Sequence, residues 1–276
     1  MRILFIGDVV GQSGLDVVRE YLPKAISEWD IELTIINGEN SAERGFGITE
    51  SAYNTLLSLG ADAVTLGNHS WARKEALEFI DRAPRLIRPI NYLPDTPGRG
   101  GAFIESRNGR RVMVINALGR LFMDPIDDPF GMIDRYLQVH PLGQAANAII
   151  IDYHCEATGE KQAVGHFCDG RASLVVGTHT HTPSADHRIL PGGTAYMTDA
   201  GMTGDYDSVV GMKKDEPLRR FTTGISSGRF EPASSPGTMS GVAVQTDDDT
   251  GLAVRIAPVR MGGVLERAVP TFWTRD

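Results

Sequence analysis

The sequence predicts an α/β fold built on parallel strands, and three observations lead to this prediction. Short apolar runs recur between residues 2 and 66, and each one ends at polar side chains beside a glycine. Helical patterns separate these runs, so that strand and helix alternate. Such alternation is typical of parallel strands joined by right-handed crossovers.

Composition limits the class of protein. The chain has 276 residues, enough for one large α/β domain, and no linker is long enough to divide residues 1–276. With 41% hydrophobic and 22% charged residues, it resembles an ordinary soluble protein. The formal charge of −8 argues against a broad surface for duplex nucleic acid but leaves a small anion site open. The sequence leaves homo-oligomerisation open.

The chain shows no sign of membrane insertion or export. No run approaches the roughly 18 apolar residues of a membrane span, and Asp8 interrupts the apolar start after a few residues. We therefore interpret residues 2–6 as a strand and not as a targeting segment. Two cysteines without a CxxC spacing fit a reducing compartment. We expect a cytoplasmic protein.

The first three predicted strands end in groups that can bind a metal. Residues 2–6 are followed by Asp8, residues 33–36 by Glu39 and Asn40, and residues 63–66 by Asn68 and His69. Each side chain alone could be a simple turn or cap residue. In parallel sheets, however, ligands bind at the carboxyl ends of the strands, and all five residues fall there. The position of all five at strand ends is therefore stronger evidence for a metal site than any one of them alone.

Helices are predicted between these strands. The first follows a turn at residues 11–13, with Leu15, Val18 and Leu22 at helical spacing. The second begins after Thr49, a typical N-cap residue. A third covers about residues 73–81.

Two later strands end in histidines. Residues 148–153 form an apolar run that ends at His154, and residues 174–176 lead into His179 and His181. If the backbone stays extended there, the last two imidazoles point to the same side. Cys155 is expected in the core, because neighbouring residues of a strand face opposite ways.

Two acids could support the site without binding a metal. Glu156 is either a hydrogen-bonding partner of His154 or merely an acid at a helix terminus. Asp199, at a later strand end, could support the site in a similar way.

The remaining segments carry less chemical information. Residues 84–101 and 199–240 are expected to form loops without an assigned role, and residues 124–129 form an acidic solvated connection. Hairpins are predicted for residues 101–118, around the turn at 192–193, and for residues 241–259. Residues 230–240 are rich in Ser, Pro and Gly and are expected to be a flexible connection.

The ligand types favour two metal ions. Of the seven histidines, His140, His166 and His187 lie away from predicted strand ends and the other four lie at them. Histidine, carboxylate and carboxamide together suit iron, manganese or zinc. At least seven such groups exceed one tetrahedral site, and Glu39 is the natural bridge between two ions. Two ions can activate water and clamp a phosphoryl group.

The order of the motifs resembles the calcineurin-type metallophosphoesterases. The motifs are GD at 7–8, GEN at 38–40, GNH at 67–69, His154 and GTHTH at 177–181. The chain departs from the common pattern at three positions: Val10 replaces a histidine, Glu39 an aspartate, and Ser70 an acid. These departures, with DYHCEATGEK and TDAGMTG, resemble the bacterial YmdB-like family, described as 2′,3′-cyclic-nucleotide 2′-phosphodiesterases. The resemblance covers nearly the whole chain.

This resemblance implies a fold and a set of roles. The fold would be a layered sandwich with two central mixed β-sheets flanked by helices. One metal would be held by Asp8, Glu39, Asn40 and His181, and the other by Glu39, Asn68, His154 and His179. Asn40 would take the place left open by Val10, and His69 would protonate the leaving sugar oxygen. A metal-bound hydroxide would be the nucleophile. The family suggests iron or manganese, while the ligand set equally allows zinc.

The sequence therefore predicts a dinuclear-metal phosphodiesterase that converts small 2′,3′-cyclic nucleotides into 3′-nucleotides. One alternative is a phosphomonoesterase or 5′-nucleotidase on the same scaffold. Another is a regulatory protein that binds a nucleotide or an RNA end. A TIM-barrel amidohydrolase fits less well, because its HxH motif usually follows the first strand.

Overall fold

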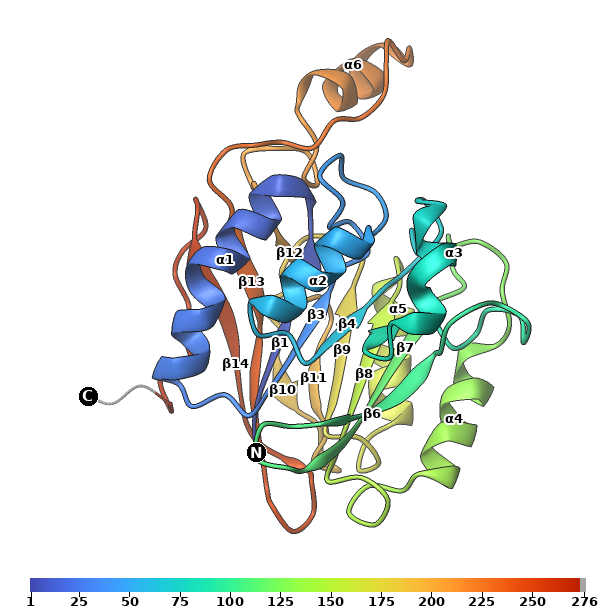
Figure 1. Cartoon of the computed structure of the whole chain (residues 1–276), viewed down its shortest axis with the longest axis vertical. Coiled ribbons are helices and arrows are strands. Elements are labelled where there is room, and N and C mark those ends of the chain that lie inside the picture. Colours follow the sequence, from blue (N-terminus) through green and yellow to red (C-terminus); the bar gives the residue numbers. More distant parts are fainter. Residues whose placement is uncertain (274–276) are drawn as a thin grey trace.

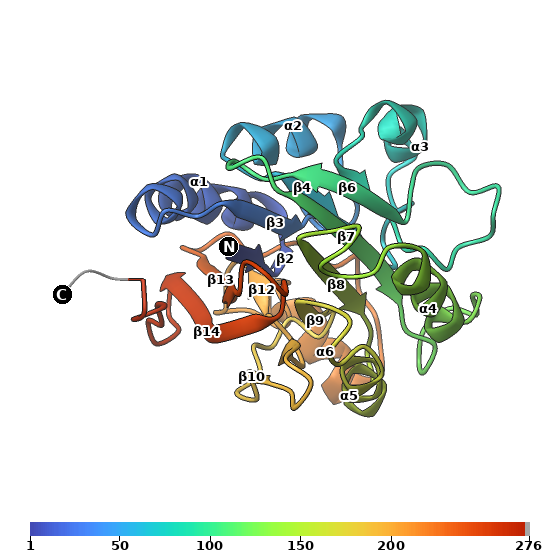
Figure 2. The same ribbon diagram turned by 90° about the horizontal axis from the view of Figure 1, so that it is seen from below.

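A computed structural model describes residues 1–273, which form four layers. Two β-sheets pack face to face at the centre, and helices cover their outer faces (Figure 1). Figure 2 looks along the layers, with α1, α2 and α3 on one side and α4 and α5 on the other. The predicted sandwich of two mixed sheets is thus confirmed.

The first sheet carries the first predicted strands. Its order is β14-β13-β1-β3-β4-β5. Neighbours among β1, β3, β4 and β5 run parallel, whereas β13 is antiparallel to β1 and β14 to β13. The strands are β1 (Arg2–Ile6), β3 (Leu33–Asn37), β4 (Ala63–Thr65), β5 (Leu86–Ile87), β13 (Thr238–Thr246) and β14 (Ala253–Gly262).

The second sheet has a parallel centre and two antiparallel edges, in the order β10-β11-β9-β8-β7-β6. Its strands are β6 (Gly101–Glu105), β7 (Arg111–Leu118), β8 (Ala148–His154), β9 (Leu174–Thr178), β10 (Arg188–Ile189) and β11 (Ala195–Met197). A short parallel pair, β2 (Asp8–Val9) and β12 (Met202–Thr203), lies beyond the end of β1.

The alternation of side chains along β1 explains the layers. Ile3 and Phe5 join the core between the sheets, where they meet residues of the second sheet such as Val114. Leu4 and Ile6 point the other way and pack under the helices. Both faces of the strand are therefore apolar, as expected for a parallel strand covered on both sides.

Helices on each side seal the outer faces. The first sheet is covered by α1 (Gly11–Glu28), α2 (Glu50–Ser58), α3 (Glu75–Phe79) and the 3₁₀ turn η1 (Ile80–Arg82), and the second by α4 (Pro129–Val139) and α5 (Thr158–Phe167). The remaining helix, α6 (Asp215–Thr223), stands away from the sheets on an arm (Figure 1). In the described part of the chain, no helix combines the length and apolar character needed to cross a membrane.

Several local predictions were confirmed and others need correction. Thr49 caps α2 by accepting a hydrogen bond from Ala52 N, and all three predicted hairpins form. The turn predicted at residues 11–13 is wrong, because α1 already begins at Gly11, whose φ of 58° is accessible to glycine.

Two helices were not predicted. The acidic connection ends at Asp128, whose carboxylate caps α4 by accepting hydrogen bonds from the next turn. The polar sequence of α6 gave no strong apolar pattern. Residues 238–240, expected to be flexible, are buried in β13, where Gly204 and Thr203 bond to them.

Candidate metal centre

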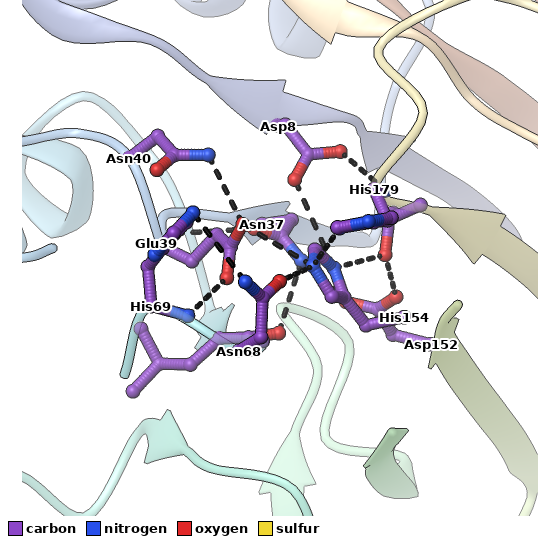
Figure 3. Close-up of polar contacts among 12 residues, drawn as sticks. Asp8, Asn37, Glu39, Asn40, Asn68, His69, Asp152, His154 and His179 are labelled. Atoms are coloured by element: carbon purple, nitrogen blue, oxygen red, sulfur yellow. Dashed lines mark hydrogen bonds and ion pairs between the residues drawn. The ribbon is translucent and has the colours of Figure 1, made fainter. Parts of the chain in front are cut away.

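The carboxyl ends of five strands from both sheets meet at one place (Figure 3). The first sheet supplies the side chains that follow β1, β3 and β4, and the second sheet supplies those that follow or end β8 and β9. Four of the contributing side chains, Asp8, Glu39, Asn40 and His154, are at most 1% exposed. The loops after parallel strands bring these residues together, as the strand-end argument predicted.

The Nε2 atom of His154 is the focus of one group. It lies 3.2 Å from Glu39 Oε1, 2.9 Å from Asn68 Oδ1 and 3.1 Å from His179 Nδ1. Ligand atoms of Glu39, His154 and His179 all lie within 4.8 Å of one another. Four atoms that can offer a lone pair thus converge on one point.

A chain of hydrogen bonds orients the His154 ring. Thr178 Oγ1 donates to Asp152 Oδ1 at 2.6 Å, so its lone pair faces His154 Nδ1 at 2.9 Å. This arrangement places a proton on Nδ1, so Nε2 is the ring nitrogen that faces Glu39 and could bind a metal ion. A hydrogen bond that fixes the tautomer of a ligating histidine is a common feature of metal sites.

A second group lies on the other side of Glu39. Asn40 Nδ2 donates to Glu39 Oε1 at 3.0 Å and lies 3.4 Å from His181 Nε2. Asp8 Oδ1 is 3.9 Å from that same histidine nitrogen. Glu39 therefore adjoins both groups.

Two buried oxygens in this second group have no hydrogen-bond partner within residues 1–273: Asp8 Oδ1 and Asn40 Oδ1. A buried acceptor without a partner costs about 1–3 kcal/mol, and more when it is charged. A cation between Asp8, Asn40 and His181 would remove that cost.

The spacing of the first group also fits a metal ion. Ligand atoms at about 2.1 Å from one ion lie about 3.0 to 3.4 Å apart at octahedral or tetrahedral angles. The contacts around His154 Nε2 have nearly these lengths. Gly67 leaves the necessary space, since a Cβ there would come within 2.4 Å of Glu39 Oε2 and 2.5 Å of His154. The residues present therefore fit a metal.

Acidic neighbours stabilise a positive charge on His154. Burial alone would lower the pKa of His154, but Glu39, Asp8 and Asp152 outweigh it and raise the pKa to about 9. Burial would likewise raise the pKa of Glu39, yet His154 and His69 hold it at about 2. Burial and the neighbouring His154 lower the pKa of His179 to about 3, which keeps that imidazole neutral.

The HxH segment is not extended, which corrects the expectation from the sequence. β9 ends at Thr178, and His179 and His181 adopt φ angles of 98° and 63°. Left-handed backbone at non-glycine residues is strained and clusters at functional sites. A hydrogen bond from His179 N to Asp8 Oδ2 at 3.2 Å holds this turn against the first sheet.

The two supporting acids have different positions. Glu156 Oε2 lies 3.2 Å from His179 Nε2, so it contacts His179 and not His154. Asp199 contacts none of the converging atoms. Its Oδ2 accepts hydrogen bonds from Thr180 N and Oγ1 and forms an ion pair with Lys161 Nζ. Asp199 thus fixes the turn that carries both histidines.

His69 lies at the edge of the centre. Its backbone N donates to Glu39 Oε2 at 3.0 Å, and its ring rests on Phe46 with centroids 4.7 Å apart. Burial lowers the pKa of its imidazole. Its Nε2 is 3.4 Å from Asn68 Nδ2, so the ring borders the first group without joining it.

Two neighbouring residues are excluded as ligands. The Val10 side chain packs with Met202 and Met212 and offers no ligand atom. The backbone of Val10 forms a β-bridge with that of Asn40. The Cys155 thiol is buried in the core as predicted, and burial raises its pKa to about 12.

Sequence reasoning missed Asp152. This buried carboxylate accepts hydrogen bonds from Thr178, Thr65 and Asn37, and burial raises its pKa to about 6. The signal was present in the sequence. An acid within an apolar strand, two residues before His154, shares the face of that histidine.

Comparison with known proteins identifies the family. The sequence profile of the YmdB-like protein family matches residues 4–259. The chain belongs to the YmdB-like family. A curated relative from Bacillus subtilis (strain 168), named 2′,3′-cyclic-nucleotide 2′-phosphodiesterase, is 50% identical over 256 residues, which cover 93% of this chain and 95% of the relative.

Solved structures of similar chains share the same architecture. A hypothetical protein from Thermus thermophilus superposes with a TM-score of 0.88 at 40% identity, covering 96% of this chain and all of the other. A protein described as a novel phosphatase from Mycoplasma pneumoniae gives a TM-score of 0.87 at 29% identity, covering 100% and 97% of the two chains. The YmdB-like fold of this chain is therefore matched over nearly its full length.

Proposed function

We propose that this chain is a dinuclear-metal phosphodiesterase that hydrolyses 2′,3′-cyclic nucleotides to 3′-nucleotides. The observation that carries the proposal is the convergence of Glu39, Asn68 and His179 on the Nε2 atom of His154. The substrate follows from the 50% identical relative, whose name gives a 2′,3′-cyclic-nucleotide 2′-phosphodiesterase activity.

Two overlapping sets of residues would hold the metals. Glu39, Asn68, His154 and His179 form the first set, and Asp8, Glu39, Asn40 and His181 form the second. Bound ions would supply positive charge for the phosphoryl oxygens and would lower the pKa of water. We infer iron or manganese, while imidazole and carboxylate ligands also accommodate zinc.

The reaction adds water to phosphorus and breaks the bond between phosphorus and O2′. The oxygen that leaves needs a proton, and we propose that His69 delivers it. The side chain borders the ligand group without belonging to it, and Phe46 holds its ring. Imidazole is the side chain most often used for proton transfer. Asn68 and Glu39 fix the position of His69 through contacts to the ring and to the backbone.

Hydrolysis of 2′,3′-cyclic AMP by protein loaded separately with iron, manganese or zinc tests this proposal. Metals are counted in the same samples, and 5′-AMP and a linear diester serve as alternative substrates. Turnover of the cyclic substrate with about two metals per chain is the expected result. Faster release of phosphate from 5′-AMP would instead identify a phosphomonoesterase. Two bound metals without turnover of any substrate would leave a regulatory binding protein as the better explanation.

A further inference from the structure

A cavity of about 830 Å³ lies under the arm that carries α6. Its walls come from the loop after β3, from the segment after His69, and from both ends of the α6 arm. Five cations line it together with two acids, Glu43 and Glu231. The cations are Arg44, Arg73, Lys213, Arg220 and Arg229. A chain with a formal charge of −8 thus concentrates positive charge in one hollow.

Three of these cations lack an acidic partner. Lys213 pairs with Glu231 at 2.7 Å, and Arg220 pairs with Glu216 at 2.6 Å. Arg44, Arg73 and Arg229, by contrast, form no ion pair with any residue in the range 1–273. Guanidinium groups without an acidic partner in a hollow are suited to bind phosphate, which they can contact through two parallel hydrogen bonds.

Two aromatic rings lie among these charges, and Arg220 stacks over one of them, Phe230, at 4.1 Å from its centroid. Phe46 and Phe230 both line the cavity and pack on the same small cluster around Met212. Both rings are partly exposed. Cationic grooves interleaved with aromatic rings are typical of proteins that bind single-stranded nucleic acid, because bases stack on the rings.

The cavity adjoins the metal centre on the side of His69. Phe46 lines the cavity and also contacts the His69 ring at a centroid distance of 4.7 Å. If His69 protonates O2′, then the ribose of that O2′ lies beside His69. Phe46 then separates that ribose from the cavity, so a nucleotide whose 5′ side points past Phe46 reaches the cavity.

We propose that this cavity binds the nucleotide chain on the 5′ side of the scissile cyclic phosphate. The preferred substrate would then be a short RNA whose 3′ end carries a 2′,3′-cyclic phosphate. This inference rests on the proposed function and adds to it the substrate class. The volume is within the roughly 300–1,000 Å³ of ligand sites. Three arginines without an acidic partner exceed what a lone cyclic phosphate, already facing the metal centre, requires.

The test compares three substrates with the metal-loaded enzyme: adenosine 2′,3′-cyclic phosphate, its 5′-phosphorylated form, and the dinucleotide ApA with a 2′,3′-cyclic end. We expect kcat/KM to rise about tenfold from the first substrate to the dinucleotide, as one charge-assisted phosphate contact allows. Arg44→Ala and Arg229→Ala should reduce that ratio. Arg135→Ala is the matched control, because Arg135 is exposed on α4 and, among the described residues, bonds only within its own helix.

A binding measurement separates this inference from the proposed function. Fluorescence anisotropy with ApA ending in a 3′-phosphate reports affinity without turnover. Arg44→Ala and Arg229→Ala should each weaken binding about tenfold and flatten its salt dependence, by about 0.7 in the log–log slope per lost phosphate contact. Arginine-dependent binding without cleavage of any cyclic end would reject the proposed function and keep the RNA site.

Two results would overturn the inference. One is equal kcat/KM for adenosine 2′,3′-cyclic phosphate and the dinucleotide, with the arginine variants binding ApA as the wild type does. The other is a rise in kcat/KM that is complete with the 5′-phosphate and does not increase further with the second nucleotide. That result would identify a mononucleotide site.

Discussion

Lys161 and Asp199 form an ion pair of 2.7 Å in which both side chains are at most 2% exposed. Asp199 lies just beyond the end of β11 and Lys161 within α5, so the pair joins two elements behind the histidine turn. The same Asp199 oxygen accepts two hydrogen bonds from Thr180. The geometry of His179 and His181 therefore depends on a buried charge pair that belongs to neither proposed set of metal ligands.

Breaking this pair should destabilise the protein strongly. Asp199→Asn leaves the Lys161 ammonium buried without a counter-charge, which typically costs about 3–5 kcal/mol. Urea unfolding of chelated protein measures the loss apart from metal binding. Asp207→Asn is the control, since its ion pair with Lys214 is exposed and should contribute at most about 1 kcal/mol. Equal midpoints for the two variants would contradict this role of Asp199.

His69→Ala should abolish most cyclic-phosphate hydrolysis while the metal content stays close to that of the wild type. The reason is position, since His69 borders the ligand group without joining it. General acid catalysis contributes typically 10²- to 10⁴-fold, so kcat should fall by about this factor. Elemental analysis and initial rates on the same samples provide the check. Full activity in the variant would exclude the acid role.

Glu39→Gln should reduce metal binding at both positions. The Glu39 carboxylate adjoins both groups, whereas the amide carries no charge and cannot bridge two cations equally well. Wild-type protein should gain about 2.7 kcal/mol of stability at a metal concentration 100 times Kd, and a chelator should reverse the gain. The variant should show little of this gain. Glu28→Gln, an exposed change on α1, should behave like the wild type.

Gly67→Ala should weaken metal binding without changing a ligand. A Cβ there would come within 2.5 Å of Glu39 and His154 and would push them apart. Gly159 offers the matched control, because a Cβ at that position in α5 meets nothing within 4 Å. Gly159→Ala should raise stability by roughly 0.5–1 kcal/mol. Titration calorimetry with manganese should separate the two variants, and equal affinities would argue against a crowded centre at Gly67.

The Cys168 thiol should resist alkylation in the folded protein. Burial raises its pKa to about 12, from about 8.5 in an unfolded chain. Below about pH 8.5 the thiol is neutral in both states and does not lower the free energy of unfolding. Between about pH 8.5 and 12 it ionises only in the unfolded chain, so the free energy of unfolding falls as pH rises. Iodoacetamide labelling at pH 8 with and without urea measures the protection. Cys168→Ala should flatten the fall in unfolding free energy between pH 8 and 10.

The sequence alone determined the strands and their polar ends. Asp8, Glu39 and Asn68 each follow an apolar run, and the periodicity of those runs indicates buried parallel strands regardless of context. The order of motifs also identified the family, which the profile match over residues 4–259 confirmed. The assignment of each ligand to a metal stays a prediction.

Only the tertiary structure decided how the two halves of the centre meet. Asp8 and Glu39 follow strands of one sheet, whereas His154 and His179 end or follow strands of the other. Their distances depend on how the sheets pack, through contacts between residues far apart in the chain. The same packing brings Asp8, which follows β1 of the first sheet, to the left-handed backbone of His179, whose N–H bonds to the Asp8 carboxylate. Local periodicity carries no information on such contacts, and for the same reason it could not show that arginines of the α6 arm line one cavity with Phe46.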